Sequence, residues 1–123
     1  MPLNVLIVDD SAAIRKILER VLRHTDFQLG DVLEAGDGKE ALAKLNGGEI
    51  GLILSDINMP NMDGLELLQQ IKANDAWKTL PISMVTTEGS QDKVMQAIQL
   101  GATGYIRKPF TADQIKEKLI GIL

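Results

Sequence analysis

Three aspartates of this chain stand where short apolar runs end, and their side chains could share one metal ion and one phosphoryl group. Asp9 and Asp10 follow the run NVLIV, and Asp56 follows the run LIL within the segment SDINMPNMDG. If these runs are parallel strands, their carboxyl ends meet at one edge of a sheet, where α/β proteins bind ligands. Carboxylates crowded there repel unless a cation compensates, and Mg²⁺ prefers oxygen ligands. The pattern therefore predicts a site for one hard metal cation beside a phosphoryl group.

Short apolar segments alternate with helical patterns along the whole chain. Right-handed connections between parallel strands are nearly obligatory, so five strand-helix pairs predict an α/β fold: a doubly wound five-stranded parallel sheet with helices on both faces. The expected strands are Asn4 to Val8, Val32 to Ala35, Leu52 to Leu54, Ile82 to Val85 and Gly104 to Arg107.

The helical patterns have recognisable starts. Ser11 is a good N-cap, and a one-sided apolar arc follows it, which predicts a core-facing first helix. Thr111 and Gln114 form a capping box for the last helix. The arc consists of Ile14, Ile17, Leu18, Val21 and Leu22. The remaining expected helices are Gly38 to Leu45, Gly64 to Ala73, and one from the N-cap Ser90 to Leu100.

Length and composition limit the classes of protein to consider. The 123 residues suit a single domain, residues 1–123, and the chain has no cysteine for disulfides or thiolate metal sites. No apolar run reaches the roughly 18 residues of a membrane span, and the N-terminal run is too short for a signal peptide. We therefore expect a cytoplasmic protein. A net charge of -4 gives no general attraction to nucleic acid or anionic membranes.

A known family shares these motifs in the same order. The Asp9-Asp10 pair, Asp56 within SDINMPNMDG, Thr86 after the fourth strand, and Lys108 in GYIRKPF resemble the receiver domain of two-component response regulators. The resemblance covers essentially the whole chain and is strongest to the stand-alone regulators of chemotaxis. It implies the flavodoxin-like strand order 2-1-3-4-5, which makes the first and third strands neighbours.

The resemblance also implies the chemistry of the predicted site. Asp56 would accept a phosphoryl group from a histidine kinase and later lose it by autodephosphorylation. Mg²⁺ would be held by Asp10, Asp56 and the backbone carbonyl of Asn58, with Asp9 acting through water or in support. Lys108 would bind the phosphoryl group as a point charge. The peptide bond between Lys108 and Pro109 would be cis, as in the family.

A conformational switch and an output surface follow from the same resemblance. Thr86 would move toward the phosphoryl group, and Tyr105 would turn into the space that Thr86 leaves. The apolar residues between Val94 and Leu100 spread over about 220° of the helical wheel, more than a core requires. We interpret the excess as a partner face on the fourth helix, fifth strand and fifth helix, although isolated exposed aliphatics are also normal. Its members would be Val94, Ile98, Tyr105, Arg107 and Lys118.

The output of the switch stays open at the level of sequence. In family members that control chemotaxis this face binds a flagellar motor switch protein, but Gln91, Ile98 and Arg107 depart from their pattern. A phosphate sink and control of another pathway are the alternatives, and a phosphatase could be a further partner. We expect a monomer that is not an enzyme. Phosphatases of the haloacid dehalogenase type also form aspartyl phosphates, but they need an acid where this chain has Asn58.

Overall fold

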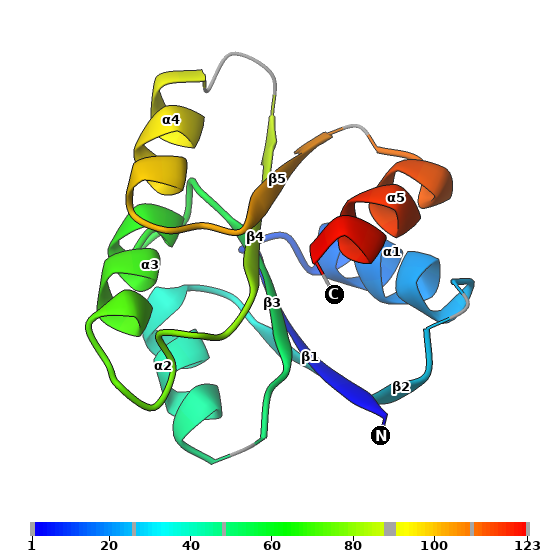
Figure 1. Cartoon of the computed structure of the whole chain (residues 1–123), viewed down its shortest axis with the longest axis horizontal. Coiled ribbons are helices and arrows are strands. Elements are labelled where there is room, and N and C mark those ends of the chain that lie inside the picture. Colours follow the sequence, from blue (N-terminus) through cyan, green and yellow to red (C-terminus); the bar gives the residue numbers. More distant parts are fainter. Residues whose placement is uncertain (1, 26, 48, 88–90, 109, 123) are drawn as a thin grey trace.

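The centre of the molecule is a five-stranded parallel sheet in the order β2-β1-β3-β4-β5 (Figure 1). The structure, a computed structural model, describes residues 2–25, 27–47, 49–87, 91–108 and 110–122. The strands are β1 (Leu3–Val8), β2 (Leu29–Ala35), β3 (Leu52–Asp56), β4 (Ile82–Thr87) and β5 (Gly104–Lys108). The expected α/β fold and strand order are therefore confirmed.

Helices cover both faces of this sheet. On one face lie α1 (Ala12–Arg23) and α5 (Ala112–Ile122), and on the other lie α2 (Gly38–Asn46), α3 (Gly64–Lys72) and α4 (Gln91–Gln99) (Figure 1). The side chains of β1 divide accordingly: Val5 and Ile7 pack toward α1 and α5, whereas Leu6 and Val8 pack toward the other three helices. A sheet buried on both faces needs such continuous apolar strands.

Polar residues that precede the helices determine where these begin. Ser11, Asp37 and Asp63 cap α1, α2 and α3, each through a side-chain oxygen that accepts a main-chain N–H three residues later. Thr111 and Gln114 exchange hydrogen bonds of 2.9 and 3.2 Å, as the predicted capping box requires. Such caps satisfy N–H groups that have no partner within the helix. They place each of these helix starts close to the strand end before it.

Some strand boundaries differ from those expected. β2 begins at Leu29, three residues early, because Leu29 pairs with Leu3 across a break in the register of β1. β3 and β4 each continue two residues further than expected, to Asp56 and Thr87. A strand prediction based on apolar runs ends too early where the last residues of a buried strand are polar. Thr86 therefore lies inside β4 and not after it.

One prediction about the first helix is wrong. Ile17, expected on the core side of α1, is 46% exposed, while Leu18 and Leu22 are buried. Ile17 lies at the edge of the apolar arc, and the part of α1 that is buried is narrower than this arc. The expected N-cap Ser90 and the peptide bond before Pro109 lie outside the described residues. Among the helices that the structure describes, none has the length and apolar character to cross a membrane.

Candidate functional site

The register of the sheet brings the ends of β1 and β3 level with each other. Val8 of β1 lies opposite Ser55 of β3, and the next residues along the two strands are Asp9 and Asp56. Neighbouring strands are about 4.8 Å apart, so the two carboxylates must come together. They lie at the carboxyl edge of the sheet, between the two strands where the direction of winding reverses. Ligands of such folds bind at this point.

A third carboxylate completes an acidic cluster at this edge. Ligand oxygens of Asp9, Asp10 and Asp56 all lie within 4.8 Å of one another. Asp9 and Asp56 are buried, whereas Asp10 is exposed. Both oxygens of Asp9 already have partners, since Oδ1 accepts the N–H of Ser11 at 2.9 Å and Oδ2 accepts from Lys108 at 2.8 Å. The cluster could hold a divalent cation, chiefly through the other two acids.

Lys108 supplies positive charge to the cluster from the end of β5. Its Nζ lies 2.8 Å from Oδ2 of Asp9 and 3.7 Å from Oδ2 of Asp56. Its side chain is only 14% exposed, because its long stem reaches past β4 toward the central strands. Three carboxylates and one ammonium leave the cluster with two uncompensated negative charges.

Burial raises the pKa of Asp56 above its ordinary value. Lys108 opposes this shift of the pKa most strongly, and the neighbouring charge of Asp9 reinforces it. The N–H of Ile57 donates to Oδ1 of Asp56 at 2.8 Å and also favours the ionised form. Because the carboxylate lacks compensating charge, a bound cation would stabilise it.

Thr86 and Tyr105 lie on the same face of the sheet. Met84 pairs with Tyr105 across β4 and β5, and both pack beneath the helices α2, α3 and α4. Residues two apart along a strand share a face, so Thr86 points to the same side as Met84. Thr86 is buried, and its hydroxyl donates a long hydrogen bond of 3.4 Å to the carbonyl of Thr87. Because this bond is long and therefore weak, the hydroxyl would lose little by leaving the carbonyl of Thr87 for a phosphoryl oxygen.

The loop after Asp56 is fastened to two helices by contacts that the sequence analysis missed. Asn61 adopts a φ of 64°, and its amide donates to Oδ2 of Asp37 at 2.7 Å, at the start of α2. On the other side, Lys93 of α4 donates to Oδ1 of Asn58. Asparagine tolerates the left-handed region, so its place in the NMPN turn was a usable signal. Nothing local indicated that Lys93 would contact this loop.

Gly64 allows α3 to begin directly beside the acidic edge. A Cβ at this position would collide with the main-chain oxygen of Asp56 and would lie 2.8 Å from Cε of Met84 and 2.9 Å from Cα of Ile57. The N–H of Gly64 also donates to the carbonyl of Ile57 at 2.7 Å. The loop between β3 and α3 is therefore held tightly at both of its ends.

Comparison with known proteins assigns this chain to a family. The model of the response regulator receiver domain matches residues 5–120. The chain belongs to this family. The chemotaxis protein CheY of Pseudomonas aeruginosa is 41% identical over 117 residues, covering 95% of this chain and 93% of that protein. CheY-3 of Vibrio cholerae is 42% identical over 117 residues, covering 95% and 88%. The solved structure of the chemotaxis response regulator CheY4 of Vibrio cholerae has a TM-score of 0.88 at 36% identity and covers 100% of both chains.

Membership in the family gives the predicted motifs a common context. Receiver domains of this kind are signalling proteins of two-component systems and phosphorelays, and they are not classical enzymes. Of the residues that carried the resemblance, this receiver domain gathers Asp9, Asp10, Asp56 and Lys108 at one edge of the sheet. Thr86 stands in the neighbouring strand β4, next to the strand that ends in Asp56.

The predicted partner face of the receiver domain needs one correction on α4. Ile98 is 46% exposed, as expected for a docking residue, and Met95 beside it is 55% exposed. Val94, however, is buried and belongs with Ala97 to the core against α3 and β4. The core contacts of Val94 and Ala97 fix the orientation of this short helix. The apolar residues that follow each of them, Met95 and Ile98, therefore face outward. Val94 therefore contributes no side chain to the face.

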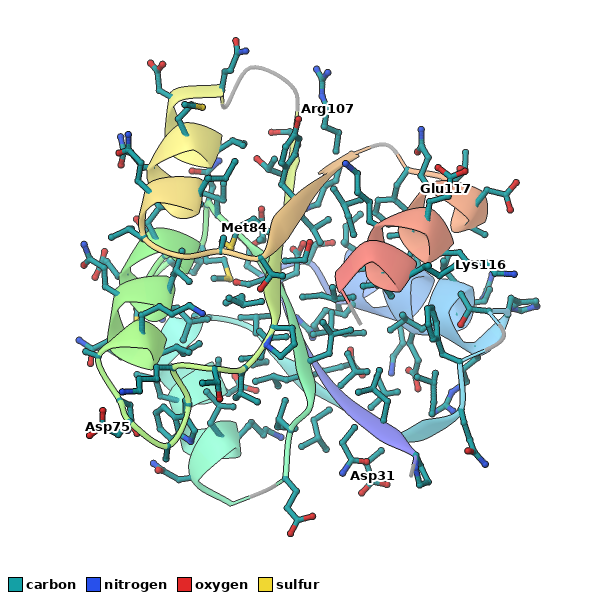
Figure 2. All side chains as sticks on the ribbon, viewed as in Figure 1. Asp31, Asp75, Met84, Arg107, Lys116 and Glu117 are labelled. Carbon is teal, nitrogen blue, oxygen red and sulfur yellow. The ribbon has the colours of Figure 1, made fainter. Side chains whose placement is uncertain are left out.

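β5 and α5 contribute the other part of the predicted partner face, a polar and partly hollow surface. Nζ of Lys118 lies 5.2 Å from the centre of the Tyr105 ring, a distance at which a cation is attracted to the ring. A shallow hollow of about 180 Å³ beside them is lined by Tyr105, Ile106, Arg107, Gln114 and Lys118. Arg107 stands at the upper end of β5 and extends away from the sheet (Figure 2). The hollow and the apolar residues of α4 lie on neighbouring elements.

Proposed function

We propose that this receiver domain, residues 1–123, is a phosphorylation-dependent switch whose phosphoacceptor is Asp56. The observation that carries the proposal is a buried carboxylate set between two further acids and one lysine. Burying a charge with so little compensation is costly for a fold. It becomes understandable where a cation and a phosphoryl group complete the site.

The chemistry of the donor set fits Mg²⁺, which receiver domains generally bind. Asp10, Asp56 and the main-chain carbonyl of Asn58 would hold the ion. Asp9, already engaged by Ser11 and Lys108, would act through a water molecule or by orienting Lys108. When bound, Mg²⁺ neutralises negative charge on the oxygens of the phosphoryl group.

Asp56 would be the nucleophile toward a phosphoryl group carried by a histidine of a partner kinase. Oδ1 is oriented by the N–H of Ile57, and Oδ2 lies 3.7 Å from Lys108. A new O–P bond forms as the P–N bond to the histidine breaks, and the released imidazole keeps the bonding electron pair. Lys108 would stabilise the charge on the transferring group. Attack of water on phosphorus would later release phosphate and restore Asp56.

Thr86 and Tyr105 would transmit the state of Asp56. The long 3.4 Å hydrogen bond of the Thr86 hydroxyl leaves it available to a phosphoryl oxygen. Movement of Thr86 would open space on the face of the sheet that Tyr105 shares. The ring would then turn inward and alter the surface formed by α4, β5 and α5.

The output would be a contact with a partner protein at Ile98, Tyr105, Arg107 and Lys118. Two relatives of this chain are chemotaxis proteins, which favours a motility partner such as a flagellar motor switch component. A phosphate sink and control of another pathway are the alternative roles. Capture of partners with and without a phosphoryl mimic on Asp56 distinguishes them: a motor component favours motility control, and the kinase alone favours a sink.

Labelling of the acceptor tests the proposal directly. Acetyl phosphate with Mg²⁺ should add one phosphoryl group, measured by intact-protein mass, and chelation of Mg²⁺ should prevent it. Asp56→Asn should abolish labelling. Asp75→Asn, which removes an exposed carboxylate, should leave it unchanged. Full labelling of Asp56→Asn would refute the assignment.

A further inference from the structure

Lys93 occupies a position at which its charge does not stabilise its own helix. It is the third residue of α4, where the helix dipole disfavours a cation. The side chain is exposed, yet its ammonium is held by Oδ1 of Asn58 at 2.5 Å, across to the loop between β3 and α3. A lysine in the first turn is therefore compensated by a partner outside α4.

The partner of Lys93 belongs to the acidic edge. Asn58 follows Asp56 by two residues, and its carbonyl is part of the proposed metal site. The ammonium of Lys93 thus contacts, from α4, a residue two positions after Asp56, while Lys108 reaches Asp56 itself from β5. The acceptor on Asn58 is a neutral amide oxygen, and an ammonium binds an anionic oxygen more strongly. Lys93 could exchange this partner for a phosphoryl oxygen.

The charges of the edge leave a role for a second lysine. Three carboxylates and Lys108 carry two net negative charges, which one divalent cation balances. Conversion of Asp56 to an aspartyl phosphate replaces one negative charge with about two. One negative charge then remains without compensation, and Lys93 is a second cation, after Lys108, that contacts the segment beginning at Asp56.

We propose that Lys93 is a second cationic positioning residue for the phosphoryl group. It rests on Asn58 in the unphosphorylated protein and moves to an oxygen of the phosphoryl group or of its anionic donor. The inference rests on the proposed function of Asp56. Because Lys93 is in the first turn of α4, the movement also links the phosphorylation site to the helix that carries Ile98.

Substitution of Lys93 tests this role through its charge. Lys93→Gln should lower the rate of labelling by acetyl phosphate and Mg²⁺ by about three- to fivefold at low ionic strength, and the difference should shrink at high salt. Lys93→Arg should keep most of the rate. Lys39→Gln is the matched control, since Lys39 is an exposed lysine in the first turn of α2 at the same edge of the sheet. It should change the rate little.

A titration with beryllofluoride and Mg²⁺, a phosphoryl mimic, gives a readout independent of turnover. Followed by the amide resonances of the Asn58 loop, its midpoint should rise about three- to fivefold in Lys93→Gln and stay unchanged in Lys39→Gln. Equal rates and midpoints for Lys93→Gln and wild type would overturn the inference, and so would a loss that salt does not reduce. Labelling of Asp56→Asn would instead refute the proposed function, so the two failures are distinguishable.

Discussion

Replacing Asp56 with asparagine should make the protein more stable at neutral pH, although it removes the proposed phosphoacceptor. Burial holds the pKa of Asp56 above its ordinary value, so ionisation costs more free energy in the folded than in the unfolded protein. Asparagine has nearly the same size, and its side-chain oxygen can still accept the N–H of Ile57. The variant therefore loses an unfavourable charge and little packing.

Burial is the main reason for the raised pKa of Asp56, and the charges around Asp56 give the scale of the effect. With an effective dielectric constant of about 20, attraction to Lys108 at 3.7 Å amounts to about 4.5 kcal/mol. Repulsion from Asp9 and from Asp10, each at most 4.8 Å away, amounts to at least about 3.5 kcal/mol apiece. The two repulsions exceed the attraction by about 2.5 kcal/mol, and solvent around the exposed Asp10 reduces this excess. We expect the free energy of unfolding to rise by about 1–2 kcal/mol.

This gain should depend on pH with a defined sign. A carboxyl group with a raised pKa holds its proton more tightly in the folded protein, so wild-type stability falls as pH rises from the unfolded pKa of Asp, about 3.9, through the raised folded pKa. Above that window the variant should show its full advantage. Below it Asp56 is protonated in both states, and the advantage from charge should vanish.

Urea unfolding at a series of pH values measures the effect. Asp75→Asn is the matched control, because its carboxylate is 95% exposed, lies at the periphery (Figure 2) and should change stability by less than about 0.5 kcal/mol. At tenfold its dissociation constant, Mg²⁺ should stabilise the wild type by about 1.4 kcal/mol and Asp56→Asn by clearly less. An Asp56→Asn variant less stable than wild type at neutral pH would refute the electrostatic reasoning.

Four further predictions test the switch, the partner face and the loop. Thr86→Ala should still accept phosphate but lose phosphate-dependent partner capture; loss of labelling would place Thr86 among the reacting groups. Ile98→Asp should abolish partner capture without changing labelling or the thermal melt, since the side chain is 46% exposed; unfolding would mean that it is core. Mg²⁺ should barely change the fluorescence of Trp77, because this residue precedes β4 at the end of the sheet opposite the acids; a large saturable quench would contradict that placement. Gly64→Ala should cost about 2–3 kcal/mol of stability, because its Cβ would meet main-chain atoms, whereas Gly47→Ala, with nothing within 4 Å, should be near neutral; equal urea midpoints would disprove the steric argument.

The acidic edge was predictable because its residues are tied to strand ends. Asp9 and Asp56 are placed by main-chain register, and Lys108 ends the last strand. Their meeting required only the order of the strands. That order came from the resemblance to a family, since the periodicity of each strand carries no information about its neighbours.

The surface of α4 was less predictable, because a nine-residue helix offers few turns from which to read its orientation. Val94 and Ile98 are four residues apart and differ by only about 40° around the helix, so a modest rotation of α4 determines which of them is buried. The contacts with α3 and β4 decide between them, and these depend on the whole assembly. The bond between Lys93 and Asn58 joins residues 35 positions apart, and polar contacts at a surface leave no periodic trace in a sequence.

The uncompensated negative charge at Asp56 destabilises the fold. It also suggests how phosphorylation of Asp56 could affect residues at a distance. Asp56 lowers the stability that asparagine at the same position would give, and residues of this kind are found at functional sites. Phosphorylation would add negative charge near Lys108, which lies 3.7 Å from Oδ2 of Asp56 and 2.8 Å from Oδ2 of Asp9. It would also offer the Thr86 hydroxyl a stronger acceptor than the carbonyl of Thr87 at 3.4 Å. Thr86 lies in β4, beside the strand that carries Tyr105, and β4 leads into α4. A change of charge at this edge could therefore reach the partner face through β4 and its two neighbouring strands.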